Sequence, residues 1–309
     1  MSAIKRDTGR REKIAARRAA QQRAQTRNRL LLAGGAIIAV VAVVVGLVIW
    51  KTASKTPAAP APKAPGGTSL NALIAQTTSV PAATVDAVGN GGGLVNSKPL
   101  SITGSPLTAG GKPEMLYMGA EYCPFCAAER WAMVVALSRF GTFSGLHTTH
   151  SAAQNGGGNA EVYPNTPTWT FYKSSYASRY LTFTPVEMNT NIPDPRTGGY
   201  TTLQNPTREQ QALISKYDAP PYVPSQDAGA IPFVDIGNRY LVVGASYSPA
   251  LLQGLTWSQV AADLHNPGSP VAKGVLGTAN YMTAAICRVT GNQPASACTA
   301  TVRSLEGQV

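Results

Sequence analysis

The stretch Glu114–Cys126, which reads EMLYMGAEYCPFC, decides the fold. It opens with a short apolar run that ends at Gly119, and such a run predicts a buried β-strand. Beyond Cys126 the apolar residues recur at helical spacing, so that one face carries Met133, Val134, Leu137 and Phe140. The chain is therefore expected to run strand, turn, helix, with the motif Cys-Pro-Phe-Cys at the turn.

The segments that follow predict further elements of an α/β domain. Gly141 is expected to close the helix as a left-handed cap, and Leu146–His150 to form the next strand. Between residues 152 and 206 the sequence turns to Gly-rich and Pro-rich loops, which predict an insertion with two strands, Thr168–Tyr172 and Ser178–Thr184.

The remainder of the chain predicts mainly helices around one hairpin. The expected elements are, in order, a helix from a Thr207 cap to about Tyr217, a hairpin of Ile231–Ile236 and Arg239–Gly244 around Gly237-Asn238, a helix after a Thr256 cap, a helix over Thr278–Val289 that ends at Gly291, and a shorter helix after Pro294.

The motif itself predicts thiol chemistry. At the N-terminus of a helix, unpaired N–H groups and the helix dipole stabilise a thiolate, so the pKa of Cys123 should fall below the free value of about 8.5. Pro124 suits the first helical position, and Cys126 lies one turn into the helix, where it is less exposed. We therefore expect Cys123 to attack a sulfur and Cys126 to resolve the mixed disulfide.

Two other interpretations of the motif stay open. Zinc could be held by Cys123, Cys126, His147 and His150, although two histidines three apart on a strand project to opposite faces. Alternatively, Cys123 and Cys126 form a purely structural disulfide.

Residues 30–50, LLLAGGAIIAVVAVVVGLVIW, predict a transmembrane helix, because twenty-one uncharged residues span a bilayer core as a helix. A cleaved signal peptide is the alternative, but its basic lead would be much shorter than residues 1–29. The basic tail keeps the N-terminus cytoplasmic and places the rest outside the cytoplasm. Residues 51–67 predict a Pro/Ala-rich linker and residues 68–309 the folded extracytoplasmic domain, so the lipid bilayer is one expected partner.

The charge distribution excludes nucleic acid as a partner. The net charge is +11, but residues 1–29 hold ten Lys and Arg against Asp7 and Glu12. The remaining residues carry sixteen basic groups against thirteen acidic ones, which is too even a balance to attract a polyanion.

The other two cysteines, Cys287 and Cys298, lie close in sequence in a domain expected to be exported. A disulfide there would staple two terminal helices and contribute about 3 kcal/mol. The alternative is a second exchangeable pair that passes electrons between Cys123–Cys126 and a membrane partner.

The order of strand, CPFC, helix, strand, and later a hairpin and helix resembles the thioredoxin superfamily. The stretches GAEYCPFCAAERWAMVVALSRFGTFSGL and YPNTPTWTFYKSSYASRYLTF are similar to the membrane-anchored family called domain of unknown function 929, over residues 68 to about 300. The resemblance to thioredoxins implies that Ile231–Pro232 forms a cis-proline loop that faces the cysteines. Tyr122 stands where thioredoxins have Trp, and Tyr117 replaces their buried acid.

Proton handling at such a site is then expected to differ from that of thioredoxins. Glu129, one turn beyond Cys126, is a candidate proton relay, or else it pairs on the surface with a cation such as Arg130. The carboxylate of Glu121 would oppose a strongly lowered pKa at Cys123.

These observations predict a thioredoxin-like α/β domain with an inserted β-hairpin region and extra terminal helices, behind one transmembrane helix. The expected function is a membrane-anchored thiol-disulfide oxidoreductase that acts on protein dithiols and disulfides, without an organic cofactor and with a membrane electron-transfer partner. The alternative is a redox-inert docking or scaffold protein with a structural CPFC disulfide. Eight aromatics between Tyr163 and Tyr200 either cover the core or line a client groove.

Overall fold

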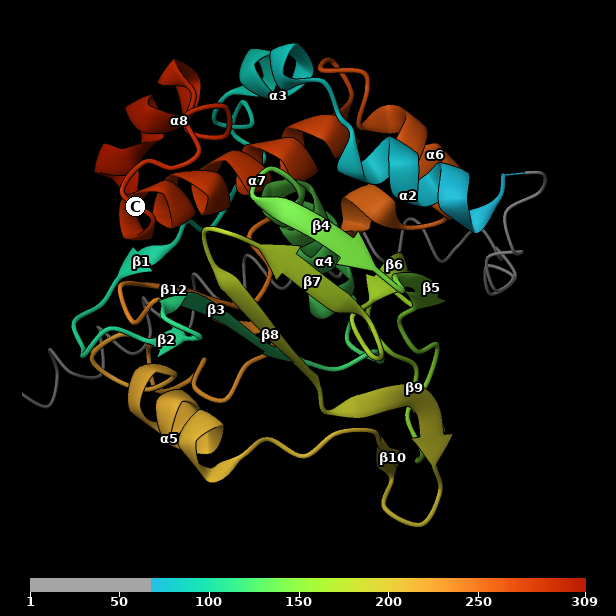
Figure 1. The fold of residues 1–309 in the computed structure, drawn as a ribbon. Coiled ribbons are helices and arrows are strands. Elements are labelled where there is room, and N and C mark those ends of the chain that lie inside the picture. Colours follow the sequence, from blue (N-terminus) through green and yellow to red (C-terminus); the bar gives the residue numbers. More distant parts are fainter. Residues whose placement is uncertain (1–67) are drawn as a thin grey trace, which may run out of the picture. The chain divides into compact units, whose positions relative to one another are not determined.

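The computed structural model describes residues 68–309, which form a mixed α/β unit (Figure 1). Its elements are α2 (Leu70–Thr78), α3 (Ala82–Val88), β1 (Leu100–Ser101), β2 (Thr108–Ala109), β3 (Lys112–Gly119), α4 (Pro124–Ser138), β4 (Gly141–Ser144), β5 (His147–His150), β6 (Pro167–Thr170), β7 (Ser175–Ser178), β8 (Thr182–Glu187), β9 (Asn189–Asp194), β10 (Gly199–Thr202), α5 (Arg208–Tyr217), β11 (Phe233–Ile236), β12 (Tyr240–Val243), α6 (Trp257–Asp263), α7 (Pro270–Val289) and α8 (Ala300–Leu305), with short 3-10 turns at Pro249–Leu252 and Glu306–Gln308.

The predicted tail, transmembrane helix and linker lie outside the described residues. Within residues 68–309, none of the helices has the length and apolar character needed to span a bilayer.

The centre of the unit is a mixed sheet built around β3. Strand β8 pairs with β3 in parallel, from Glu114 opposite Thr182 to Gly119 opposite Glu187. Strand β11 pairs antiparallel with β3 on its other edge, and β12 follows β11. The four main strands therefore lie in the order β8, β3, β11, β12.

Successive side chains of β3 lie in two different cores, one on each face of the sheet. Met115 and Tyr117 belong to the larger core, which includes side chains of α4 and α7. Leu116 and Met118 belong to a smaller core that includes Tyr217 at the end of α5. This double burial explains why the strand reads as a continuous apolar run rather than an alternating one.

Helix α4 begins at Pro124 with Cys123 as its N-cap, as the sequence predicts. The predicted left-handed cap at Gly141 is wrong, because the helix ends at Ser138 with Arg139 in a right-handed C-cap and Gly141 already belongs to β4. A side chain at Gly141 would meet the carbonyl of Ala177 and the ring of Tyr176, so glycine is needed here for close packing rather than for its backbone conformation.

The strand that follows α4 in the sheet is not the expected one. Leu146–His150 does form β5, but β5 pairs with β6 in a separate two-stranded sheet. The central strand parallel to β3 is β8, which lies inside the segment 152–206 that was predicted to be an insertion. The additions to the sheet are thus divided, with β4–β7 before β8 and the pair β9–β10 after it.

The C-terminal predictions are mostly confirmed. Thr207 and Thr256 cap α5 and α6 with reciprocal capping boxes, and Gly237 and Asn238 both have positive φ in the hairpin turn. Helix α7 is longer than expected and begins at Pro270. Gly277 weakens the sequence signal for a helix. Glycine is required there because a Cβ atom would lie only 2.6 Å from the Cα of Gly91.

Candidate thiol site

The two cysteines of the motif are held by the start of α4. Cys123 caps the helix, and its Sγ accepts a hydrogen bond from the backbone N–H of Cys126 at 3.2 Å. The carbonyl of Cys123 accepts the first helical hydrogen bond, from Ala127 N at 2.9 Å. Because Cys126 lies in the first turn of the helix, its amide has no carbonyl acceptor within the helix and is free to face the sulfur.

This geometry makes the two thiols unlike each other. Burial alone would raise the pKa of Cys123, but hydrogen bonds from the thiol and amide of Cys126, together with the charge of Arg130, lower it. The pKa of Cys126 is raised well above its usual value by burial and by the neighbouring Cys123. A first thiol with a lowered pKa and a second thiol that keeps its proton suit sequential attack and resolution.

The loop before β11 faces this pair. The Ile231–Pro232 peptide bond is cis, as the resemblance to thioredoxins implies. Cys123 Sγ donates to the carbonyl of Ile231 at 3.6 Å, which brings the loop of Pro232 against the motif although 108 positions separate the two residues.

Cys123 is only 4% exposed and Cys126 is fully buried, and the aromatic residues beside them in the motif pair with other rings. The ring of Tyr122 stacks on that of Tyr200 from β10, with 4.0 Å between centroids. Phe125, which is 38% exposed, meets Tyr163 edge to face. Tyr122 and Phe125, on either side of Cys123 in the chain, thus each pair with a tyrosine of the segment for which the sequence left a client groove open.

A buried ion pair adjoins the cysteines. Arg130 donates from Nε and Nη2 to the two carboxylate oxygens of Glu187 at 2.8 and 2.6 Å, and both side chains are 0% exposed. Tyr117 Oη lies 3.5 Å from the same carboxylate, and the guanidinium lies over the Tyr117 ring. Sequence reasoning missed Glu187; the available signal was its place at the end of a strand.

Glu129 does not form the surface pair with Arg130 that was one of its two expected roles. It is fully buried, so a surface pair with Arg130 is wrong, and Arg130 binds Glu187 instead. Both carboxylate oxygens accept hydrogen bonds from Ser246, one from its N–H at 2.8 Å and one from its hydroxyl at 2.7 Å. Burial raises the pKa of Glu129 to about 7. Its described hydrogen bonds lead toward the segment after β12 and not toward a thiol.

Residues 98–288 match the sequence profile of a family described as Domain of unknown function (DUF929). The chain belongs to this family. No curated protein and no solved structure matches the chain. The expected resemblance to this family is confirmed, and the matched range holds Cys123, Cys126, Glu187 and Pro232.

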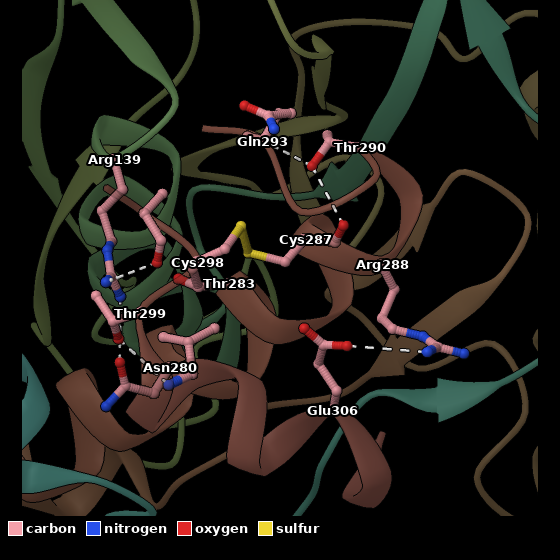
Figure 2. The surroundings of a disulfide bond; sticks show 12 residues. Arg139, Asn280, Thr283, Cys287, Arg288, Thr290, Gln293, Cys298, Thr299 and Glu306 are labelled. Carbon is pink, nitrogen blue, oxygen red and sulfur yellow. Dashed lines mark hydrogen bonds and ion pairs between the residues drawn. A yellow bond between two sulfur atoms is a disulfide. The ribbon is translucent and has the colours of Figure 1, made fainter. Parts of the chain in front are cut away.

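The second cysteine pair of this DUF929 protein forms a disulfide (Figure 2). Cys287 in the last turns of α7 is bonded to Cys298, just before α8, with 5.8 Å between Cα atoms. Both residues are buried. On one side of the bond Arg139 reaches Asn280 and the carbonyl of Ala297, which ties α4 to the same region.

The remaining sequence candidates of the DUF929 domain lie apart from the thiol chemistry. Glu121 accepts a hydrogen bond from Thr170 Oγ1 at 2.6 Å, and burial raises the pKa of its carboxyl. His150 Nδ1 contacts the carbonyl of its neighbour Ser151. Within residues 68–309, no group of three or more His, Cys, Asp or Glu side chains is arranged to hold a metal ion.

Proposed function

We propose that this DUF929 protein is a membrane-anchored, extracytoplasmic thiol-disulfide oxidoreductase that acts on protein dithiols and disulfides through Cys123 and Cys126. The anchor and the export of the domain rest on the apolar residues 30–50 and the basic tail before them. The chemistry rests on the described residues.

The arrangement of the sheet supports a thioredoxin-like fold. A strand, a helix and a second strand parallel to the first are β3, α4 and β8, and the antiparallel strands β11 and β12 extend the other edge. Helix α7 then packs against α4. With the motif at the strand-to-helix turn and the loop of Pro232 opposite it, the unit resembles thioredoxins apart from the segments β4–β7 and β9–β10.

One observation carries the functional proposal: the amide of Cys126 donates to the sulfur of Cys123 at 3.2 Å. This donor stabilises the thiolate of Cys123, and a nucleophilic cysteine gains reactivity from that thiolate character.

The reaction proceeds in two balanced exchanges. The Cys123 thiolate attacks a client disulfide, so that a Cys123–client bond forms, the client disulfide breaks and the released client thiolate takes up a proton. Cys126 then gives up its proton, and its thiolate attacks Cys123 Sγ, which forms the Cys123–Cys126 disulfide and releases the second client thiolate, which takes up a proton in turn. Two electrons pass to the client, and oxidation of a client dithiol is the reverse sequence. Repeated turnover needs a membrane dithiol or disulfide partner.

A second candidate function is a redox-inert docking or scaffold protein. It is favoured by the 4% exposure of Cys123, since a covered sulfur meets few partners. Under this alternative, Cys123 and Cys126 would serve only as a structural bridge.

A trapping experiment separates the two. In full-length Cys126→Ser, the first exchange is retained and the second is blocked, so the proposal expects mixed disulfides that reductant releases and that Cys123→Ser abolishes. Isolation of Cys126→Ser from membranes without any reducible adduct, together with no reduction of insulin disulfides by the wild-type protein, would favour the scaffold.

A further inference from the structure

The buried ion pair leaves one nitrogen of Arg130 unused. Its Nε and Nη2 bind Glu187, whereas Nη1 is inaccessible to solvent and has no hydrogen-bond partner among the described residues. A buried guanidinium N–H without an acceptor is costly, and such groups in native proteins call for a reason.

The position of Arg130 points to Cys126. The two residues are four apart in α4, so they lie on the same face of the helix, one turn from each other. Tyr117, whose ring lies 5.7 Å from the guanidinium carbon, provides a second link. A side chain built on Gly119 would collide with the Tyr117 hydroxyl and would lie 3.0 Å from Cys126 Sγ, so hydroxyl and sulfur flank the same point of the strand.

We propose that Arg130 is a positioning residue that stabilises the thiolate of the Cys123–Cys126 pair, and that Glu187 limits how much of its charge the sulfurs receive. This inference rests on the proposed function. It applies most strongly to the second exchange, in which the fully buried Cys126 must lose its proton and attack Cys123 Sγ. Arg130 keeps its own protons throughout and acts only through its charge.

The surrounding groups leave Arg130 as the relevant cation. Burial raises the pKa of Tyr117, Tyr122 and Tyr200, so these phenols stay neutral. The pKa of Cys123 is lowered in part by Arg130, although burial and the contacts with Cys126 have larger effects. At Cys126, burial has the largest effect and raises the pKa, whereas the charge of Arg130 lowers it.

The test compares two variants of the full-length protein that differ only at Arg130. Glu187→Gln leaves the guanidinium without its counter-ion, and the double variant Arg130→Met/Glu187→Gln removes both charges. The reduction potential of the Cys123–Cys126 pair is measured in glutathione buffers without any client.

Because a stabilised thiolate favours the dithiol form, Glu187→Gln should have a less negative potential than the wild type. The double variant should have the most negative of the three. We expect at least about a tenfold difference in redox equilibrium constant between the two variants, which is about 30 mV for this two-electron couple. Arg130→Lys in the Glu187→Gln background should keep most of the shift in potential, and the double variant should keep its mixed disulfide longer in single turnover.

A matched control is Arg139→Met, which removes the half-buried arginine at the end of the same helix, bonded to Asn280 and Ala297. It should leave the potential unchanged. Thermal unfolding of each variant shows whether it is folded. If the double variant is not folded, the comparison of Glu187→Gln with the wild type still tests the sign of the shift in reduction potential.

The two proposals fail separately. Equal potentials in Glu187→Gln and the double variant, or no shift of Glu187→Gln from the wild type, would overturn the role of Arg130 while client exchange by the wild type stands. A clear split of the potentials with no exchange on any protein disulfide would overturn the proposed function and support the electrostatic role.

Discussion

The ring of Tyr200 lies parallel to that of Tyr122, with 6° between their planes and 4.0 Å between their centroids. Tyr122 immediately precedes Cys123, and Tyr200 belongs to β10, in the pair β9–β10 that follows the central strand β8. The stack therefore connects an addition to the sheet with the nucleophile. Access to the thiol is expected to depend on it.

Removal of this stack should expose Cys123. Tyr200→Ala is expected to speed alkylation of Cys123 by about three- to tenfold, since an aromatic pair is worth about 0.5–1.5 kcal/mol. The measurement is the rate of thiol labelling in the reduced full-length protein. Tyr172→Ala, which replaces a tyrosine of the same region that lies beside Lys173, is the control and should leave the rate unchanged. An unaltered rate in Tyr200→Ala would show that the stack does not limit access.

The stability of the protein should depend on pH through Glu129. Burial raises its pKa to about 7, above the value of about 4.3 expected in the unfolded chain, so the folded state binds more protons between these values. Stability from this group is complete below about pH 4 and is lost as the pH rises through about 7.

Glu129→Gln removes that dependence, because an amide can hold the same two contacts to Ser246 without ionising. The variant should gain up to about 3 kcal/mol relative to the wild type between pH 4 and pH 8, measured by urea unfolding at each pH. Asp235, whose pKa burial also raises to about 7, titrates in both proteins and cancels in the difference. A constant difference across this range would mean that Glu129 is ionised in the folded protein.

The disulfide between Cys287 and Cys298 should act on stability alone. Replacing both cysteines by Ala is expected to lower the free energy of unfolding by about 3 kcal/mol, because the bond closes a short loop between α7 and α8. Alkylation of Cys123 and exchange with clients should be unchanged. Loss of exchange in a folded double variant would instead favour the interpretation of a second exchangeable pair.

Local signals in the sequence account for what could be predicted. The capping boxes at Thr207 and Thr256, the turn at Gly237-Asn238 and the cap at Cys123 each depend on residues within one turn. Glu187 was missed because 57 positions separate it from Arg130, and only the parallel pairing of β8 with β3 brings the two together. The stack on Tyr200 is non-local in the same sense.

The aromatics between Tyr163 and Tyr200 divide in a way that composition could not reveal. Trp169, Phe171 and Phe183 are buried in the larger core, and Tyr176 and Tyr180 pack against it, so five of the eight cover the core as one of the two interpretations expected. Tyr163 and Tyr200 flank the thiol site instead. A client groove lined by these two tyrosines remains a prediction.

The central claim is that the start of α4 lowers the pKa of the Cys123 thiol. The most direct test is the pH dependence of Cys123 alkylation in the reduced full-length protein, with Cys123→Ser as the blank. The account predicts a midpoint below the ordinary value of about 8.5, since the amide of Cys126 and the charge of Arg130 lower this pKa. A midpoint at or above that value would contradict it.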